Sequence, residues 1–364
     1  MTPGDRIRRN LEEKGWTQSD LAKILDRPLP TINEIITGKK TITPETAIGL
    51  SDALGGSPSE WLAIEAEYRL SLLDAEDYSV RQRSKLFEYA PIKDMEKRGW
   101  IKKSASAFEL ESELKLFFRV DSLTKKPELS VSTRRSLSVD DEMNPSQKAW
   151  CIRARNLALS LDIPTFSDAR FEKGMRNLKK LTTSPDVAKL VPRILTEMGI
   201  RFVIVEQLPR TRIDGAAFWI DRDKPVIALS LRYDRIDSFW HTLGHELSHI
   251  RHKDDLKVDA DIVGKSRPSP VEQSSIERRA DSEAAAAWID QEELMSFIDR
   301  IGPLYSLSRI NQFANKMKVH PGIIVGQLQY RGEIGYQACR ETLVKVRNMI
   351  TSEALTDGWG HFLD

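Results

Sequence analysis

The chain has 364 residues, of which 30% are charged, and a formal net charge of +1 at pH 7. This length allows two or three domains, and the two cysteines, Cys151 and Cys339, are too few and too far apart for a disulfide framework or a thiolate metal site. No apolar run reaches the roughly 20 residues that span a bilayer, and no apolar segment follows the charged start. We therefore expect a cytoplasmic protein with no membrane partner.

Residues 1–70 predict a domain of short helices around one tight turn. Thr17 can cap a helix over residues 18–25, a further helix covers residues 30–37 before Gly38, and Thr43-Pro44 begins another. This order is typical of the helix-turn-helix plan, whose second helix enters the major groove of DNA.

On that plan, an asparagine can read adenine, a threonine can contact a thymine methyl, and lysine or glutamine can bind phosphates. The candidate DNA contacts are Gln18, Thr31, Asn33, Thr37, Lys39 and Lys40. Acidic side chains slightly outnumber basic ones in this domain, and Glu34 on the reading helix would repel phosphate. A helical protein-interaction module of the same shape is therefore the alternative.

Residues 71–189 predict a helical connector, with helices near residues 93–100, 109–118, 147–161 and 168–181. A polar segment over residues 123–141 interrupts them, and we expect it to form a loop. Trp100, Trp150 and the neighbouring phenylalanines are expected in a core rather than in a base-stacking surface.

Three strands are predicted next, over residues 200–205, 215–220 and 226–231. They would form a small sheet beside the helix that follows. One interpretation is that the segment at Gly215 lies at an exposed sheet edge, to which a peptide substrate could add as a strand. The other is an ordinary core hairpin.

The sequence His245-Glu246-Leu247-Ser248-His249 predicts a metal centre. Two histidines four residues apart share one helix face and can bind one ion. Catalytic zinc takes three protein ligands and leaves one position open for water. Glu246 can then act as a general base on the activated water.

The third ligand must come from elsewhere in the chain. Glu277 is the candidate, because an alanine-rich helix is predicted from about residue 275. Asp281, one turn later, could orient a zinc-binding histidine through its other ring nitrogen. The alternatives are Glu272, Glu283 or His241 as ligand, or a helix with two surface histidines and no metal; His252 is expected at the helix end.

Residues 301–364 also predict helices, over residues 307–316 and 322–330. Zinc peptidases commonly use a donor to stabilise the oxyanion of the tetrahedral intermediate. His320 is the catalytic candidate, with Tyr233 and His361 as further possibilities. For His320, a helix cap is the alternative interpretation.

Two segments resemble known families. Residues 17–70, through Thr17-Gln18-Ser19-Asp20-Leu21-Ala22, Thr31 to Lys39 and Ile42 to Ala47, resemble the Xre-type domain of HigA-type antitoxins. Residues 190–300 resemble the ImmA/IrrE family of metallopeptidases through Gly215 to Phe218, Val226 to Ser230, His245 to His249 and Glu277 to Asp281. The sequence departs from the ImmA/IrrE pattern at two positions. His241 stands where an apolar or aromatic residue is expected, and the alanine-rich stretch ends in Trp288 where the family usually has a phenylalanine soon after the acidic motif.

The resemblance implies zinc as cofactor, bound by His245, His249 and Glu277, and regulated cleavage of a DNA-binding repressor. We therefore expect an α+β chain with an all-α helix-turn-helix domain, a helical middle and a zincin-like domain with a small sheet. Its expected function is that of a DNA-binding transcriptional regulator with a zinc endopeptidase. The alternative is an antitoxin or regulator whose zinc domain senses or binds without cutting. Expected partners are operator DNA, a repressor or cognate toxin as substrate, and a second copy in a homodimer.

Overall fold

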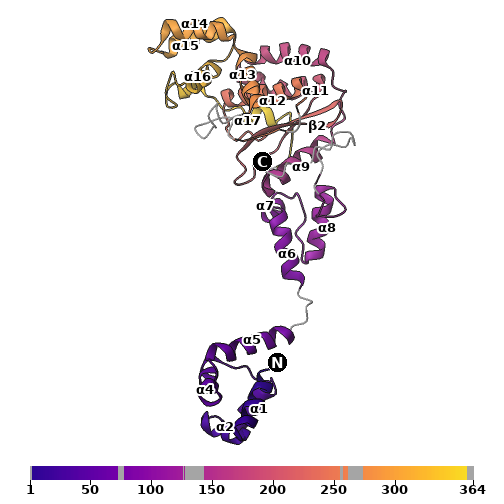
Figure 1. Ribbon diagram of the computed structural model, residues 1–364. Coiled ribbons are helices and arrows are strands. Elements are labelled where there is room, and N and C mark those ends of the chain that lie inside the picture. Colours follow the sequence, from indigo (N-terminus) through magenta and orange to yellow (C-terminus); the bar gives the residue numbers. More distant parts are fainter. Residues whose placement is uncertain are drawn as a thin grey trace. The chain divides into compact units, whose positions relative to one another are not determined.

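The computed structural model describes residues 2–72, 78–125, 127, 143–254, 257–260 and 274–358. The chain divides into two compact units, residues 1–82 and 83–364 (Figure 1). None of the helices in these described ranges combines the length and apolar character that crossing a bilayer requires.

The first unit contains helices α1 (Pro3–Lys14), α2 (Gln18–Ile24), α3 (Leu29–Ile36), α4 (Pro44–Leu54) and α5 (Pro58–Leu72). Thr17 caps α2 as predicted: its hydroxyl oxygen accepts from the Asp20 amide at 3.2 Å, and the Asp20 carboxylate accepts from the Thr17 amide at 2.9 Å. Ile32, Ile35 and Ile36 of α3 are buried against the other helices. The predicted domain of short helices is therefore confirmed.

The second unit is built on one five-stranded sheet in the order β4-β2-β3-β1-β5. Its strands are β1 (Arg201–Ile204), β2 (Ile213–Asp221), β3 (Lys224–Leu229), β4 (Lys257–Ala260) and β5 (Leu355–Thr356). β1 runs parallel to β3 and β5, whereas β2 is antiparallel to β3 and β4. The three strands predicted from the sequence are confirmed as β1, β2 and β3.

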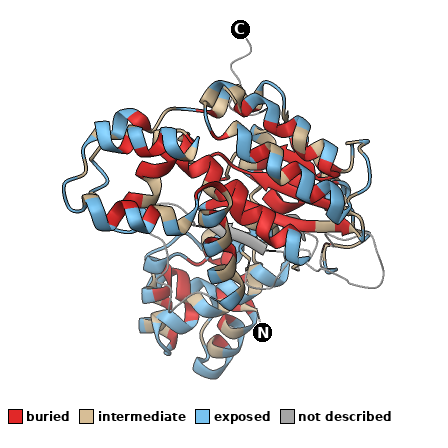
Figure 2. Ribbon diagram, turned by 90° about the horizontal axis from the view of Figure 1, so that it is seen from above, coloured by how far each residue is buried: buried red, intermediate tan, exposed pale blue. Residues whose placement is uncertain are grey.

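Alternation along the strands divides the core of this unit into two layers. Phe202 and Ile204 of β1 face one layer, and Val203 faces the other, because successive side chains of a strand point to opposite faces. Figure 2 shows buried red along much of β1, β2 and β3 and along the helix that crosses them, whereas the outer helices have exposed pale-blue faces.

The first layer contains α10 (Asp168–Leu181), α11 (Val191–Met198), α12 (Ile236–His252), α13 (Ser275–Trp288), α14 (Gln291–Ile301), α15 (Leu307–Met317), α16 (Pro321–Tyr330) and α17 (Arg347–Thr351). Two short 3-10 helices, η1 (Pro185–Leu190) and η2 (Arg340–Thr342), accompany it. The second layer contains α6 (Tyr78–Tyr89), α7 (Ile92–Lys97), α8 (Ala107–Phe118) and α9 (Pro145–Ala158). α6 begins before the boundary between the units at residues 82 and 83 and ends after it, and its Leu86 packs in the core of the second layer. Figure 1 shows α9 on the side of the sheet opposite α11 and α12.

Helices from residues 71–189 and from residues 301–364, which flank the predicted peptidase region at 190–300, therefore pack on the sheet of that region. Trp150 of the expected connector is fully buried, and its indole nitrogen donates to the Val205 carbonyl oxygen at 2.8 Å. The expected polar loop at 123–141 falls almost entirely on residues 126 and 128–142, outside the described residues.

The edge-strand interpretation of Gly215 is wrong. β2 pairs with β3 on one side and with β4 on the other, and Gly215 is aligned with Leu229 and with Asp259. The backbone of β2 is thus hydrogen-bonded within the sheet on both sides, and the core-hairpin interpretation holds.

Candidate metal centre and helix-turn-helix surface

Helix α12 places the two histidines of the motif in the interior. Every residue from Ile236 to Ile250 is buried except His241. Phe239, Trp240 and Leu243 belong to the apolar layer on the sheet, so they fix the rotation of the helix. His245 and His249, four residues apart, then lie on one face and are 2% and 1% exposed.

A small residue allows α13 to approach that helix closely. A Cβ atom on Gly244 would lie 3.1 Å from the Ala284 Cα and 2.9 Å from the Trp288 indole nitrogen. That nitrogen donates to the Trp240 carbonyl oxygen at 2.7 Å, which joins the two helices. The close packing carries Glu277, at the start of α13, to the histidines of α12.

Three potential ligand atoms converge there. The His245 Nε2 atom lies 3.1 Å from the Glu277 Oε2 atom and 3.1 Å from the His249 Nε2 atom. The distance from His249 Nε2 to Glu277 Oε2 is 3.7 Å. Among the described residues, His245, His249 and Glu277 form a group of potential metal ligands, because one ligand atom of each lies within 4.8 Å of those of the other two.

A carboxylate lies at the other ring nitrogen of each histidine. Asp281 Oδ1 is 2.9 Å from His245 Nδ1, and Asp254 Oδ2 is 2.9 Å from His249 Nδ1. A carboxylate accepts the Nδ1 proton of a neutral imidazole, which leaves a lone pair on Nε2. In that tautomer, which metal binding requires, both Nε2 atoms would present a lone pair beside the Glu277 carboxylate.

Asp254 was not identified from the sequence. It lies just beyond the end of α12, where Lys253 adopts a left-handed conformation and turns the chain back. Burial alone would raise the pKa of Asp254, but hydrogen bonds with His249 and Arg279 outweigh burial and hold it below its ordinary value. The only feature of the sequence that could have indicated this role was the position of an acidic residue five residues after His249.

Glu246 is completely buried, between α12 and β2. A Cβ atom on Gly215 would collide with the Glu246 carboxylate and would lie 3.0 Å from the Leu229 side chain. Gly215 is therefore required by the close approach of this carboxylate rather than by an uncovered sheet edge.

The alternative ligands occupy other positions. Glu283 accepts a hydrogen bond from Ser248 at 2.8 Å and lies 2.8 Å from the Nε2 atom of His252, the last residue of α12. His241 Nε2 lies 3.8 Å from the Asp281 carboxylate. Glu272 and His361 lie outside the described residues.

His320 caps α16. Its Nδ1 atom accepts from the Gly322 amide at 3.1 Å, and its backbone amide donates to the Thr182 carbonyl oxygen at 2.7 Å. Burial lowers the pKa of His320, which favours the neutral ring. These contacts match the cap interpretation, and the described contacts do not bring His320 to the three ligand atoms. Tyr233 accepts a hydrogen bond from Arg232 at 2.8 Å.

In the first unit, the candidate DNA contacts lie at the start of α2, on α3 and in the segment directly after α3. Thr31 is half-buried, and the remaining candidates are exposed: Gln18, Asn33, Thr37, Lys39 and Lys40. The Thr37 hydroxyl donates to the Asn33 carbonyl oxygen at 2.7 Å, so this hydroxyl proton is used within the helix and the methyl group is left for contacts.

Comparison with known proteins identifies the first unit. Residues 7–61 match the family model described as "Helix-turn-helix". Residues of this chain are 36% identical over 69 positions to the "Uncharacterized HTH-type transcriptional regulator YddM" of Escherichia coli (strain K12), covering 19% of this chain and 73% of that protein.

Two proteins of Dichelobacter nodosus are also similar. "Virulence-associated protein A'" is 40% identical over 70 residues, 19% of this chain and 61% of that protein. "Virulence-associated protein I" is 32% identical over 79 residues, 21% of this chain and 73% of that protein. The chain thus belongs to the helix-turn-helix family.

Proposed function

We propose that this chain is a DNA-binding transcriptional regulator whose second unit is a zinc-dependent endopeptidase of the zincin type, similar to the ImmA/IrrE family. The convergence of His245, His249 and Glu277 beside the buried Glu246 carries the enzymatic part. Membership in the helix-turn-helix family supports the DNA-binding part.

The donor set fits a zinc ion. Two ligands about 2.05 Å from one tetrahedral ion lie about 3.3 Å from each other. The three distances here, 3.1, 3.1 and 3.7 Å, bracket that value. In the tautomer that ligation requires, two imidazole lone pairs and a carboxylate face one another, and a cation between them would stabilise this arrangement. Three protein ligands are also the number found in catalytic rather than structural zinc sites.

Zinc in such a set supplies a Lewis acid that makes water a nucleophile near neutral pH. His245, His249 and Glu277 would hold the ion, while Asp281 and Asp254 fix the orientation of the two rings. Glu246 accepts the proton of the attacking water and delivers it to the leaving amine as the peptide C–N bond breaks. Its burial keeps bulk water away from that carboxylate.

For DNA, α3 is the reading helix. Asn33 would contact a base edge, Thr31 and Thr37 would contact neighbouring bases, and Gln18, Lys39 and Lys40 would bind phosphates. A second copy bound to the other half of a symmetric operator is part of this proposal. The protein substrate is then a repressor-type protein, a cognate toxin or the chain itself.

A second candidate function is an antitoxin-like regulator whose zinc site senses or binds a partner without proteolysis. The covalent link to a DNA-binding unit favours it, since such a chain can regulate transcription without cleaving a separate repressor. Cleavage by the zinc-loaded chain distinguishes the two.

The primary test is the zinc content of the purified full-length chain, measured by mass spectrometry of the metal. We expect one zinc per wild-type chain and little in Glu277→Gln. Glu283→Gln is the matched control on the same helix and should retain the metal. Equal zinc in both variants would remove Glu277 from the site, and a metal-free wild type in zinc-containing buffer would refute the centre.

A further inference from the structure

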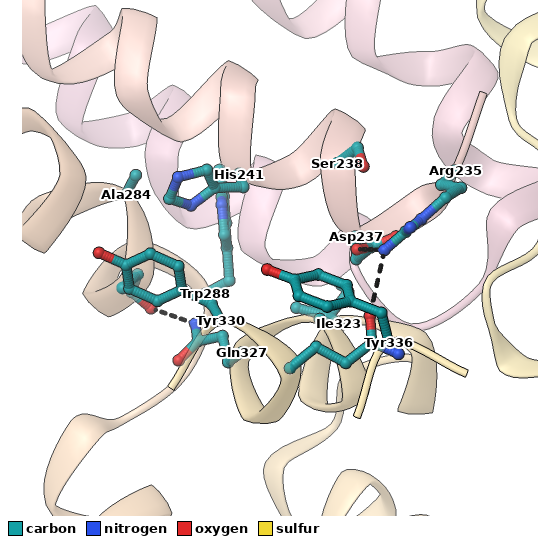
Figure 3. A pocket seen from close by; sticks show the side chains of 13 residues that line it. Arg235, Asp237, Ser238, His241, Ala284, Trp288, Ile323, Gln327, Tyr330 and Tyr336 are labelled. Carbon is teal, nitrogen blue, oxygen red and sulfur yellow. Dashed lines mark hydrogen bonds and ion pairs between the residues drawn. The ribbon is translucent and has the colours of Figure 1, made fainter. Parts of the chain in front are cut away.

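A pocket lies one to two helical turns from the candidate metal ligands. It is bounded by α12, α13 and α16 and by Tyr336 (Figure 3). His241 lines it and precedes the proposed ligand His245 by four residues, and Ala285 lines it and follows the proposed ligand Glu277 by eight. Four residues of helix advance about 6 Å, and eight advance about 12 Å. The pocket is therefore next to the metal centre along the same pair of helices.

Several aromatic rings line this pocket. Tyr330 and Tyr336 are 51% and 36% exposed, and Trp288 and Ile323 are buried beside them. The rings of His241 and Tyr330 have centroids 6.4 Å apart. Figure 3 shows these two rings on one side of the pocket and the Tyr336 ring below Ser238. Such walls suit a flat apolar group, which would bury the two exposed tyrosines.

Most polar side chains around the pocket are paired with one another. Arg235 forms an ion pair with Asp237 and contacts Gln329 at 3.4 Å, and Gln327 donates to the Ala285 carbonyl oxygen at 2.8 Å. These pairs are the dashed lines in Figure 3. They leave the pocket little capacity to bind a charged ligand.

Ser238 is different. Its side chain lines the pocket, it is 4% exposed, and its hydroxyl oxygen has no hydrogen-bond partner among the residues that the structure describes. A buried hydroxyl without a partner costs about 1–3 kcal/mol, which a polar atom on a ligand would recover. The pocket thus suits a ring that carries one hydrogen-bonding atom.

We propose that this pocket binds an aromatic side chain of a peptide that lies across the metal centre, with tyrosine preferred over phenylalanine. The proposal rests on the proposed peptidase function. An extended peptide advances about 3.3 Å per residue, so a residue about two to four positions from the scissile bond reaches the pocket. The substrate class is therefore a protein with an aromatic residue close to the cleavage point.

The binding test uses the full-length chain with zinc removed by a chelator, so that it does not depend on cleavage. Saturation-transfer NMR would compare N-acetyl-tyrosinamide, N-acetyl-phenylalaninamide and N-acetyl-alaninamide. We expect the tyrosine compound to bind about tenfold more tightly than the phenylalanine compound, and the alanine compound not to bind. Equal binding of all three would overturn the proposal.

Two variants locate the binding. Ala285→Phe fills the pocket and should reduce binding at least tenfold, whereas Ala286→Phe, on the exposed neighbouring position of α13, should not. Ser238→Ala should remove the preference for tyrosine over phenylalanine. Binding that is unchanged in Ala285→Phe would place the ligand elsewhere and refute the assignment.

Two further experiments distinguish a peptide ligand from a small aromatic molecule, and distinguish the pocket proposal from the peptidase proposal. Free phenol binding as tightly as the tyrosine amide would assign the pocket to a small effector and overturn the peptide assignment. Cleavage of a random peptide library by the zinc-loaded chain should show an aromatic residue at one fixed position, and Ala285→Phe should abolish that preference. Cleavage without any such preference would refute the pocket proposal. Ring binding without any cleavage would refute the peptidase and the role of the ring as part of a substrate, but it would leave the pocket as a binding site for an aromatic side chain.

Discussion

The two units hold their candidate functional residues in opposite ways. In the first, Asn33 and Lys39 stand on the surface of a helical core that does not depend on them. In the second, His245, His249 and Glu246 are 2%, 1% and 0% exposed, in the packing between helices and sheet. The fold persists when a side chain of a surface site is removed, but the binding free energy of such a site is distributed over many contacts. A buried centre concentrates its chemistry in few atoms, so single changes should have much larger effects there.

The largest effect is expected for Glu246→Gln. An amide cannot take a proton from water, so cleavage should fall by about 10²- to 10⁴-fold, the usual contribution of a general base. Zinc content should remain unchanged because Glu246 is not a ligand. The measurement is fragment formation from candidate repressors and from the chain itself, with metal analysis of the same sample.

The same variant also tests whether the two units act separately. DNA binding by Glu246→Gln should equal that of the wild type, since the substitution lies far along the chain in the other unit. Cleavage at the wild-type rate would rule out the proposed role of Glu246.

The next effect concerns the residues that orient the histidines. Asp281→Asn replaces the carboxylate that lies 2.9 Å from His245 Nδ1, so zinc affinity should fall by about 10- to 100-fold. Competition with a chelator of known zinc affinity measures this change. Glu283→Gln, two residues further on α13, serves as the matched control. If both variants bind zinc equally well, Asp281 does not act on the metal.

The comparison also shows where sequence information is local and where it is not. Thr17 and Gly38 mark the ends of helices within a few residues, so the first unit could be predicted closely. The motif at His245 is equally local, and the one-turn spacing of Glu277 and Asp281 placed both on one helix face. Zinc binding by His245, His249 and Glu277 was expected from the chemistry of these side chains, and it remains a prediction.

Other features depend on contacts between distant segments. The position of Gly215 at an edge was wrong because β4, which covers that side, lies more than 40 residues later. Apolar and charged residues alternate from Leu256 to Ile262, which is typical of a strand, but this signal was not used in the prediction. β5 has only two residues and comes from near the end of the chain. Asp254 orients His249 through a turn whose geometry depends on Lys253. Local periodicity indicates the strand at β4 but not its pairing with β2, and it does not encode the contacts of β5 and Asp254.

A smaller effect is expected on the surface of the first unit. Asn33→Ala should cost about 1–3 kcal/mol of discrimination at one base pair, if Asn33 reads an adenine. Selection of bound sequences from random DNA, with wild type and variant in parallel, measures it. Glu34→Gln, on the neighbouring exposed position, should instead strengthen binding to all sequences because it removes a charge that repels phosphate. An unchanged preference in Asn33→Ala would exclude a base contact.

The smallest effect is expected at the cap of α2. Thr17→Ala removes the hydroxyl that accepts from the Asp20 amide, which should cost about 1 kcal/mol of local stability. Hydrogen exchange of the α2 amides in the full-length chain measures it without requiring one cooperative transition for both units. Hydrogen bonds from Thr17 also lower the pKa of Asp20. A carboxyl whose pKa is lowered by folding stabilises the fold above its unfolded pKa and loses that contribution as the pH falls through the folded value. The difference between wild type and Thr17→Ala should therefore shrink in acid, and a difference independent of pH would show that the Asp20 carboxylate takes no part in the cap.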